Sequence, residues 1–202
     1  MEFLLIAVAH FLALLSPGPD FFLILRTALR LPLRYALSVC AGIACANAVY
    51  LVLAVLGLET VRHWSLVMLT LRYLGAAYLV YIGFLLLRAP MRPLEEVAST
   101  ATVHAQSLPK QFTLGLMSGM LNPKNAIFYL SLFTAMVSPQ TSLGLRTLYG
   151  LWMALLVLVW DMGIAVLAGN GRIKNLLGAW VFRIEKGAGA ALACFGILLA
   201  LE

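Results

Sequence analysis

Two proline motifs interrupt strongly apolar stretches of this chain, one in each half. The first is Ser16-Pro17-Gly18-Pro19-Asp20 and the second is Asn122-Pro123-Lys124-Asn125. A proline inside a helix removes a backbone donor and clashes with the carbonyl group four residues earlier. In lipid, irregular backbone persists only where it is buried in protein or lines a cavity. Paired interruptions in corresponding segments are typical of transporter binding sites. We therefore predict two broken transmembrane helices around a substrate pathway.

The composition excludes a water-soluble globular domain. Hydrophobic residues make up 63% of the 202 residues and charged residues only 11%. A chain of this length holds about six membrane spans of ~20 residues each, joined by short connections. The net charge of +6 is compatible with nucleic-acid binding. However, Lys and Arg lie at helix ends without interleaved aromatic residues, so we predict no nucleic-acid partner.

Six apolar runs define the expected spans, and a polar segment divides them into two halves. The runs are residues 3–25, 37–58, 65–87, 112–137, 147–169 and 184–201. The segment 88–111 contains prolines and charged residues, as a solvated linker does. We expect one transmembrane domain, 1–202, made of a first half 1–87, the cytoplasmic linker 88–111 and a second half 112–202.

Lys and Arg are distributed unequally between the two sides of this topology. Nine lie in connections on one side, whereas only Arg62 and Arg146 lie on the other. Cytoplasmic loops carry the excess of positive charge, so both termini are expected outside. One alternative stays open at this point. If segment 3–25 re-enters instead of crossing, the chain has five true spans and an inside N-terminus.

The two halves are expected to be related as inverted repeats. Three spans precede the linker and three follow it, and an odd number per half reverses the direction of the second half. Gly18-Pro19-Asp20 corresponds to Asn122-Pro123-Lys124 at an offset of 104 residues. The predicted fold class is therefore an all-α integral membrane protein with six transmembrane helices in a 3+3 inverted repeat, in which helices 1 and 4 are broken.

Three segments in the same order resemble the LysE/RhtB family of bacterial lysine exporters and homoserine/threonine efflux proteins. They are Ser16 to Asp20, the run Tyr73-Leu74-Gly75-Ala76-Ala77-Tyr78-Leu79-Val80-Tyr81-Ile82-Gly83, and Phe112 through Asn122-Pro123-Lys124-Asn125 to Phe128. The glycine pattern of Gly187 to Gly196 fits as well. The resemblance covers essentially the whole chain. It implies an exporter of amino acids or close derivatives in the bacterial inner membrane, driven by an ion gradient.

The second motif predicts an anion site inside the membrane. Asn122 is a favoured N-cap and Pro123 suits the first helical position. A half-helix that begins near Lys124 directs its free N–H groups and positive dipole end into the protein, where they suit the carboxylate of an amino acid. Lys124 either adds a positive charge to this site or is paired structurally. Asn125 completes the motif and is a further candidate contact.

The first motif has the same organisation. Gly18 caps the helix, Pro19 takes the first position and Asp20 lies in the first turn, where the helix dipole favours an acid. Asp20 therefore has two interpretations. It either only stabilises the start of the helix, or it binds substrate and carries a proton.

Asp161 is an acid within the fifth apolar run, and such residues face a cavity or a partner. It is expected to bind the substrate's ammonium group, to carry the coupling proton, or to do both. The structural alternative is an ion pair with Lys124 or Arg72. Asn47 in the second run contributes either an interhelical hydrogen bond or a substrate contact.

The leading hypothesis is a secondary transporter that exports amino acids from the cytoplasm, coupled to the proton motive force. The alternatives are an inorganic cation exporter and a membrane thiol or electron carrier. We expect no enzymatic activity, because no nucleophile–base pair is visible. The histidines and cysteines have no ligand spacing, so we predict no metal site and no cofactor. The expected partners are the amino acid and the lipid bilayer, and no homo-oligomer is predicted.

Overall fold

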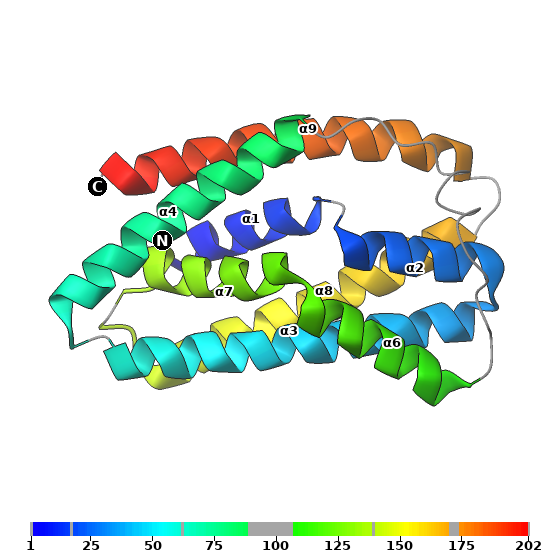
Figure 1. Ribbon diagram of the computed structural model, residues 1–202, viewed down its shortest axis with the longest axis horizontal. Helices are drawn as coiled ribbons and strands as arrows, with labels where there is room; N and C mark the ends of the chain where they lie inside the picture. The colour runs from blue at the N-terminus through cyan, green and yellow to red at the C-terminus, as the bar shows by residue number, and fades with distance from the viewer. Residues whose placement is uncertain are drawn as a thin grey trace.

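The part of the chain that the structure describes is built from α-helices. The computed structural model describes residues 2–16, 18–61, 63–88, 107–138, 140–169 and 174–201. The helices are α1 (Glu2–Leu14), α2 (Pro19–Arg30), α3 (Leu33–Val61), α4 (Ser65–Arg88), α6 (Leu108–Leu121), α7 (Pro123–Met136), α8 (Leu143–Gly169) and α9 (Lys174–Leu201). They run roughly along one long axis, and both chain termini lie at the same end of the molecule (Figure 1).

Both helix breaks are present where the proline motifs predicted them. Helix α1 ends at Leu14, and α2 begins at Pro19 with Gly18 as its N-cap. The two helices are bent by 55° relative to one another. In the second half, α6 ends at Leu121 and α7 begins at Pro123, so Asn122 alone separates them. The predicted cap and first-turn positions of these motifs are therefore confirmed, although Pro17 lies outside the described residues.

Three of the helices are individually long and apolar enough to cross a membrane. They span Leu33–Leu58 in α3, Ser65–Leu85 in α4 and Leu143–Gly169 in α8. The bent pair of α1 and α2 passes the same criteria when it is taken as one span. In α9 the apolar part is the shorter stretch Lys186–Leu198. The described residues thus form a multi-pass membrane protein, while the expected total of six spans stays a prediction.

Helices α6 and α9 begin before the apolar runs expected for these spans. Helix α6 begins at Leu108, because the Ser107 side chain caps it by accepting a hydrogen bond from the Lys110 N–H. The end of the predicted linker 88–111 is therefore helical, while residues 89–106 lie outside the described residues. Helix α9 begins at Lys174, before the expected start at residue 184. At ~1.5 Å per residue α9 is longer than the ~30 Å hydrocarbon core. The apolar run in the sequence therefore corresponds to only part of this helix.

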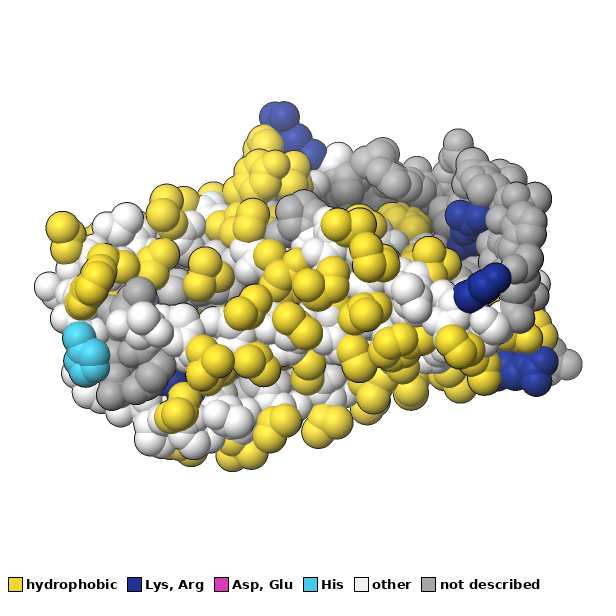
Figure 2. Space-filling model, turned by 60° about the horizontal axis from the view of Figure 1, so that its bottom comes forward, with side chains coloured by type: hydrophobic (Ala, Val, Ile, Leu, Met, Phe, Trp, Pro, Cys, Tyr) yellow, Lys and Arg dark blue, Asp and Glu magenta, His cyan; other side chains and the backbone are white. Residues whose placement is uncertain are grey.

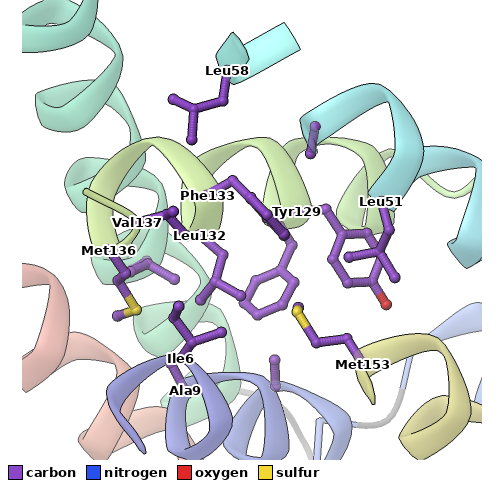
Figure 3. Packing of buried hydrophobic residues seen from close by; sticks show 14 of the residues in the cluster. Ile6, Ala9, Leu51, Leu58, Tyr129, Leu132, Phe133, Met136, Val137 and Met153 are labelled. Atoms are coloured by element: carbon purple, nitrogen blue, oxygen red, sulfur yellow. The ribbon is translucent and has the colours of Figure 1, made fainter. Parts of the chain in front are cut away.

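Helix α7 lies at the centre of the larger apolar core. Figure 3 shows Tyr129, Phe133 and their neighbours on α7 packed against side chains of α1, α3 and α8. The contacting side chains are Ile6 and Ala9 of α1, Leu51 and Leu58 of α3, and Met153 of α8. Asn122 at the start of α7 is itself buried, so this break is held inside the protein and not at its lipid-facing surface.

The outer surface is apolar over the middle of the long axis. On the face in Figure 2, hydrophobic side chains are spread over the described area, and most of the Lys and Arg atoms lie toward the right end, with a separate projection at the top edge. Exposed aliphatic side chains such as Val52, Leu151 and Val159 belong to the long helices α3 and α8. An apolar belt with charges near its limits is the surface expected of a protein embedded in lipid.

Glycines allow several helix pairs to approach closely. A Cβ atom added at Gly115 of α6 would lie 2.1 Å from the Val39 carbonyl oxygen of α3, and one at Gly42 of α3 would lie 2.1 Å from the Phe112 carbonyl oxygen. The same closeness joins α4 to α9, where a Cβ at Gly196 would lie 2.6 Å from the Ala76 carbonyl oxygen. Small residues at helix contacts are typical of membrane bundles, where van der Waals packing drives association.

We predict that Gly115→Ala destabilises the protein, because the new methyl group would collide with backbone and not with a flexible side chain. Overpacking of this kind costs about 1–3 kcal/mol. The matched control is Gly163→Ala in α8, since a Cβ there meets nothing within 4 Å. Thermal unfolding of the purified variants in detergent should show a lower midpoint for Gly115→Ala only. Equal midpoints for both variants would contradict the close packing of α3 on α6.

Candidate functional site

A cavity of about 70 Å³ lies where the two helix breaks meet. By volume it has room for roughly five water molecules. Its lining combines residues from α1, α2, α3, α7 and α8 with those at the breaks. Seven of the nine candidate residues line it: Gly18, Asp20, Asn47, Asn122, Lys124, Asn125 and Asp161. Pro19 and Pro123 are the first residues of α2 and α7 at the same two breaks.

The Asp20 carboxylate is held by three donors from the other break. Oδ1 accepts a hydrogen bond from Ser118 Oγ at 2.6 Å. Oδ2 accepts from Asn122 Nδ2 at 2.8 Å and from Asn125 Nδ2 at 2.9 Å. The sequence analysis did not single out Ser118, although it lies four residues before Asn122 and so on the same face of the chain. Asp20 therefore binds the start of α2 to the end of α6 and the start of α7.

Lys124 makes the reciprocal connection from α7 to the first break. Its Nζ donates to the Ser16 carbonyl oxygen at 3.1 Å and to the Ala13 carbonyl oxygen at 3.3 Å. In an unbroken helix Ala13 would accept from residue 17, but proline has no N–H to donate. The ammonium group compensates for this missing donor at the end of α1. Thus the structure shows backbone partners for Lys124 at the end of α1.

The starts of the two half-helices differ in how they are capped. The Asn122 side chain accepts from the Lys124 N–H at 3.1 Å, and the Asn122 carbonyl oxygen accepts from the Asn125 N–H at 3.1 Å. The N–H groups expected to hold an anion at α7 are thus occupied. At α2, by contrast, Gly18 has no side chain and provides no side-chain cap. Asp20 and Phe21 of its first turn line the cavity, so the open helix start is that of α2.

Asp161 lines the cavity from α8, together with Trp160 and Val157 of the same helix. Its side chain is only 9% exposed. Among the described residues, its Oδ2 atom has no hydrogen-bond partner. A buried carboxylate oxygen without a donor costs free energy, so it needs a partner that the fold itself does not supply. The Asp161 carboxylate can therefore accept a hydrogen bond from a positively charged or neutral donor in the cavity.

Asn47 lies on α3 and also lines the cavity. Its Nδ2 donates to the Ile43 carbonyl oxygen of the same helix at 2.8 Å. The NH₂ group of Asn47 thus has a partner within α3, whereas an interhelical hydrogen bond requires one on another helix. On the far side of the break, the Tyr78 hydroxyl donates to the Lys124 carbonyl oxygen at 3.3 Å and fixes the first turn of α7 against α4.

His10 is a cavity residue that the sequence analysis missed. It was considered only as a metal ligand, although its position three residues before Ala13 places it on the face of α1 that leads to the break. His10 is fully buried and lines the cavity. Of the three histidines, His10 is the one that lies in the apolar run leading to the first proline motif. Its helical spacing from Ala13 could have identified it as a cavity residue.

Known proteins of similar sequence identify the family of this chain. The sequence matches the family profile described as LysE type translocator over residues 11–202. It is 30% identical to a threonine efflux protein of Escherichia coli strain K12, over 100% of this chain and 98% of that protein. It is 27% identical to a homoserine/homoserine lactone efflux protein of Salmonella typhimurium, over 92% of this chain and 89% of that protein. A leucine efflux protein of Klebsiella pneumoniae is 28% identical over 68% of this chain and 64% of that protein. No solved structure matches.

We predict that two carboxylate-to-amide changes in this cavity affect stability differently. Asp20→Asn replaces an acceptor by an NH₂ group that faces the donors of Ser118, Asn122 and Asn125, so the free energy of unfolding should fall by about 1–3 kcal/mol. Asp161→Asn breaks no hydrogen bond of the kind that fixes Asp20, so it should not lower stability. Thermal unfolding of both purified variants in detergent measures the difference. Equal losses would contradict the structural role of Asp20.

Proposed function

We propose that this chain, which belongs to the LysE type translocator family, exports a small amino acid or close derivative from the cytoplasm and is driven by the proton motive force. The observation that carries the proposal is the cavity where the two helix breaks meet. It combines an open carboxylate, Asp161, with an open helix start at α2. These are complementary to the two charged groups of an amino acid. Family membership also means that the protein is a transporter and not an enzyme.

In this proposal the α-ammonium group of the substrate binds Asp161. Asp20 cannot serve equally well, because three donors already occupy its carboxylate. The substrate carboxylate binds at the start of α2, where the first-turn N–H groups and the helix dipole favour an anion. Lys124 Nζ lies within 3.9 Å of a Cβ position at Gly18, so its positive charge adds to the same end of the cavity.

Asp161 is also the proposed coupling residue. It is buried in apolar surroundings within α8, where binding of either a proton or an ammonium group relieves the cost of the bare charge. Proton and substrate then compete for one carboxylate, so protonation from the outside releases the amino acid outward. Asp20 is the second coupling candidate, and its three hydrogen bonds would have to break before it could exchange a proton.

The small size of the cavity favours a small substrate. Its volume is about 70 Å³, so a bulky substrate would require the cavity to widen. The relatives whose names state a substrate are efflux proteins for threonine, homoserine and leucine. We propose substrates at the small end of this range for the present chain. A cation exporter is the less favoured alternative, because Lys124 places a positive charge beside the same cavity.

We further propose that the chain crosses the inner membrane six times, as a 3+3 inverted repeat with both termini on the outer face. Each half contributes a broken pair, α1–α2 or α6–α7, followed by two long helices. The two termini lie at the same end of the long axis, as an even number of crossings requires (Figure 1). The nine-to-two distribution of Lys and Arg sets the direction.

Asp161→Asn should abolish gradient-driven export while the protein still inserts into the membrane. The amide keeps the size of the side chain but loses the charge that binds ammonium and the group that carries the proton. Inside-out vesicles containing the protein should accumulate radiolabelled L-threonine or L-homoserine when a proton gradient is imposed, and vesicles with Asp161→Asn should accumulate at least about 100-fold less.

The matched control is Glu2→Gln, which removes a carboxylate bonded to Ser138 and Thr141 at the other end of α1. It should retain transport within about threefold once rates are normalised to protein amount. If no amino acid in a broad panel is transported while a divalent cation is, the cation-exporter alternative replaces this proposal.

The proposed orientation predicts the behaviour of reporter fusions. Alkaline phosphatase fused after Glu202 should be active, because it folds outside the cytoplasm, and a fluorescent protein at that position should be dark. A fluorescent protein inserted in the linker after Glu96 should be bright. A C-terminal fusion that is active only in the cytoplasm would overturn the orientation and the count of crossings together.

A further inference from the structure

His10 is a buried polar side chain that the fold does not use. Its side chain is fully buried, and neither Nδ1 nor Nε2 hydrogen-bonds to any described residue. Buried polar side-chain atoms are normally paired, and each exception calls for an explanation. Since a neutral imidazole offers one donor and one acceptor, His10 lacks partners for both functions.

Aromatic rings pack around His10, and those of Phe128 and Tyr129 belong to residues that line the same cavity. The ring of Phe128 is stacked at a centroid distance of 6.2 Å, and those of Tyr129 and Trp152 lie at 5.9 Å and 6.1 Å. Phe128 offers no hydrogen-bonding group. The Tyr129 ring extends toward Leu51 and Met153 (Figure 3). These rings fix the imidazole in place while its remaining side faces the cavity, which it lines. A partner for its nitrogens must therefore come from the cavity.

The position of His10 in the cavity identifies the part of a substrate it would meet. His10 lies one helical turn before the end of α1, which corresponds to about 5–6 Å from the break. The proposed carboxylate site is at the break and the proposed ammonium site is Asp161 on α8. With these two groups fixed, the side chain of the amino acid is the substituent left to face α1 and the aromatic rings of α7.

We propose that His10 is a specificity-determining residue that hydrogen-bonds to a hydroxyl group on the substrate side chain. A hydroxyl both donates and accepts, so it satisfies either tautomer of a neutral imidazole. A substrate with a methyl group in place of the hydroxyl leaves the imidazole unpaired, and sites of this kind reject such analogues strongly. The inference rests on the proposed function and deepens it, because it defines the substrate class as small hydroxylated amino acids.

The test compares isosteric substrate pairs in proteoliposomes: L-threonine with L-valine, and L-homoserine with L-norvaline. Each pair differs by a hydroxyl in place of a methyl group. The wild-type protein should prefer the hydroxylated member of at least one pair. His10→Phe should lower that preference at least about tenfold, since the hydrogen bond is lost and the apolar analogue no longer leaves a group unpaired. His10→Gln should restore most of it, because the amide is also both donor and acceptor.

The control is His63→Phe, which changes an exposed histidine before α4 and should leave the preference unchanged. An unchanged preference in His10→Phe would overturn the inference. Should His10→Phe not insert, competition in the wild-type protein decides. L-valine and L-norvaline that inhibit transport as strongly as their hydroxylated partners, or transport of L-leucine alone, would contradict it. A protein that transports no amino acid at all would contradict the proposed function instead.

Discussion

The reciprocal bonding of the two helix breaks is the constraint on which the rest of this structure depends. A break in a membrane helix exposes carbonyl and N–H groups that lipid cannot satisfy. Here each break is completed by a charged side chain from the other. Lys124 supplies donors to the carbonyl groups at the end of α1, and Asp20 accepts from the side chains around the α6–α7 junction. Carbonyl groups at the end of α1 and polar side chains around the α6–α7 junction thus find partners in the other half, so packing of the two halves stabilises both breaks.

This arrangement separates the ionisable groups of the cavity by role. Asp20 and Lys124 stabilise the two breaks, because each hydrogen-bonds to groups at the other break. Asp161 and His10 are also buried but have atoms that no described residue pairs. They line the cavity from two different helices, α8 and α1, and the open start of α2 lines it as well. A small zwitterion with a hydroxyl group satisfies all three features at once, which a bare metal cation does not.

The sequence predicted the breaks and the cavity residues well, because proline chemistry is local. The missing N–H and the capping preferences of Gly18 and Asn122 fix where helices begin, whatever the rest of the fold. The roles of the charged residues were not predictable in the same way. Whether Lys124 meets Asp161 or the carbonyl oxygens of Ala13 and Ser16 depends on how the halves cross, and this is a tertiary property. The anion site expected at α7 stays a prediction, and the Asn122 side chain, which accepts from the Lys124 N–H, leaves the start of α2 the more open of the two.

The measurement that tests this account most directly is an experimental structure of the protein with bound L-threonine or L-homoserine. The account predicts density for the amino acid in the cavity between the breaks. Its ammonium nitrogen should lie about 3 Å from Asp161, and its carboxylate should be at the first-turn N–H groups of α2. Asp20 should keep its three amide and hydroxyl donors. Density for the amino acid elsewhere, or Asp161 turned toward lipid while substrate is bound, would contradict the account.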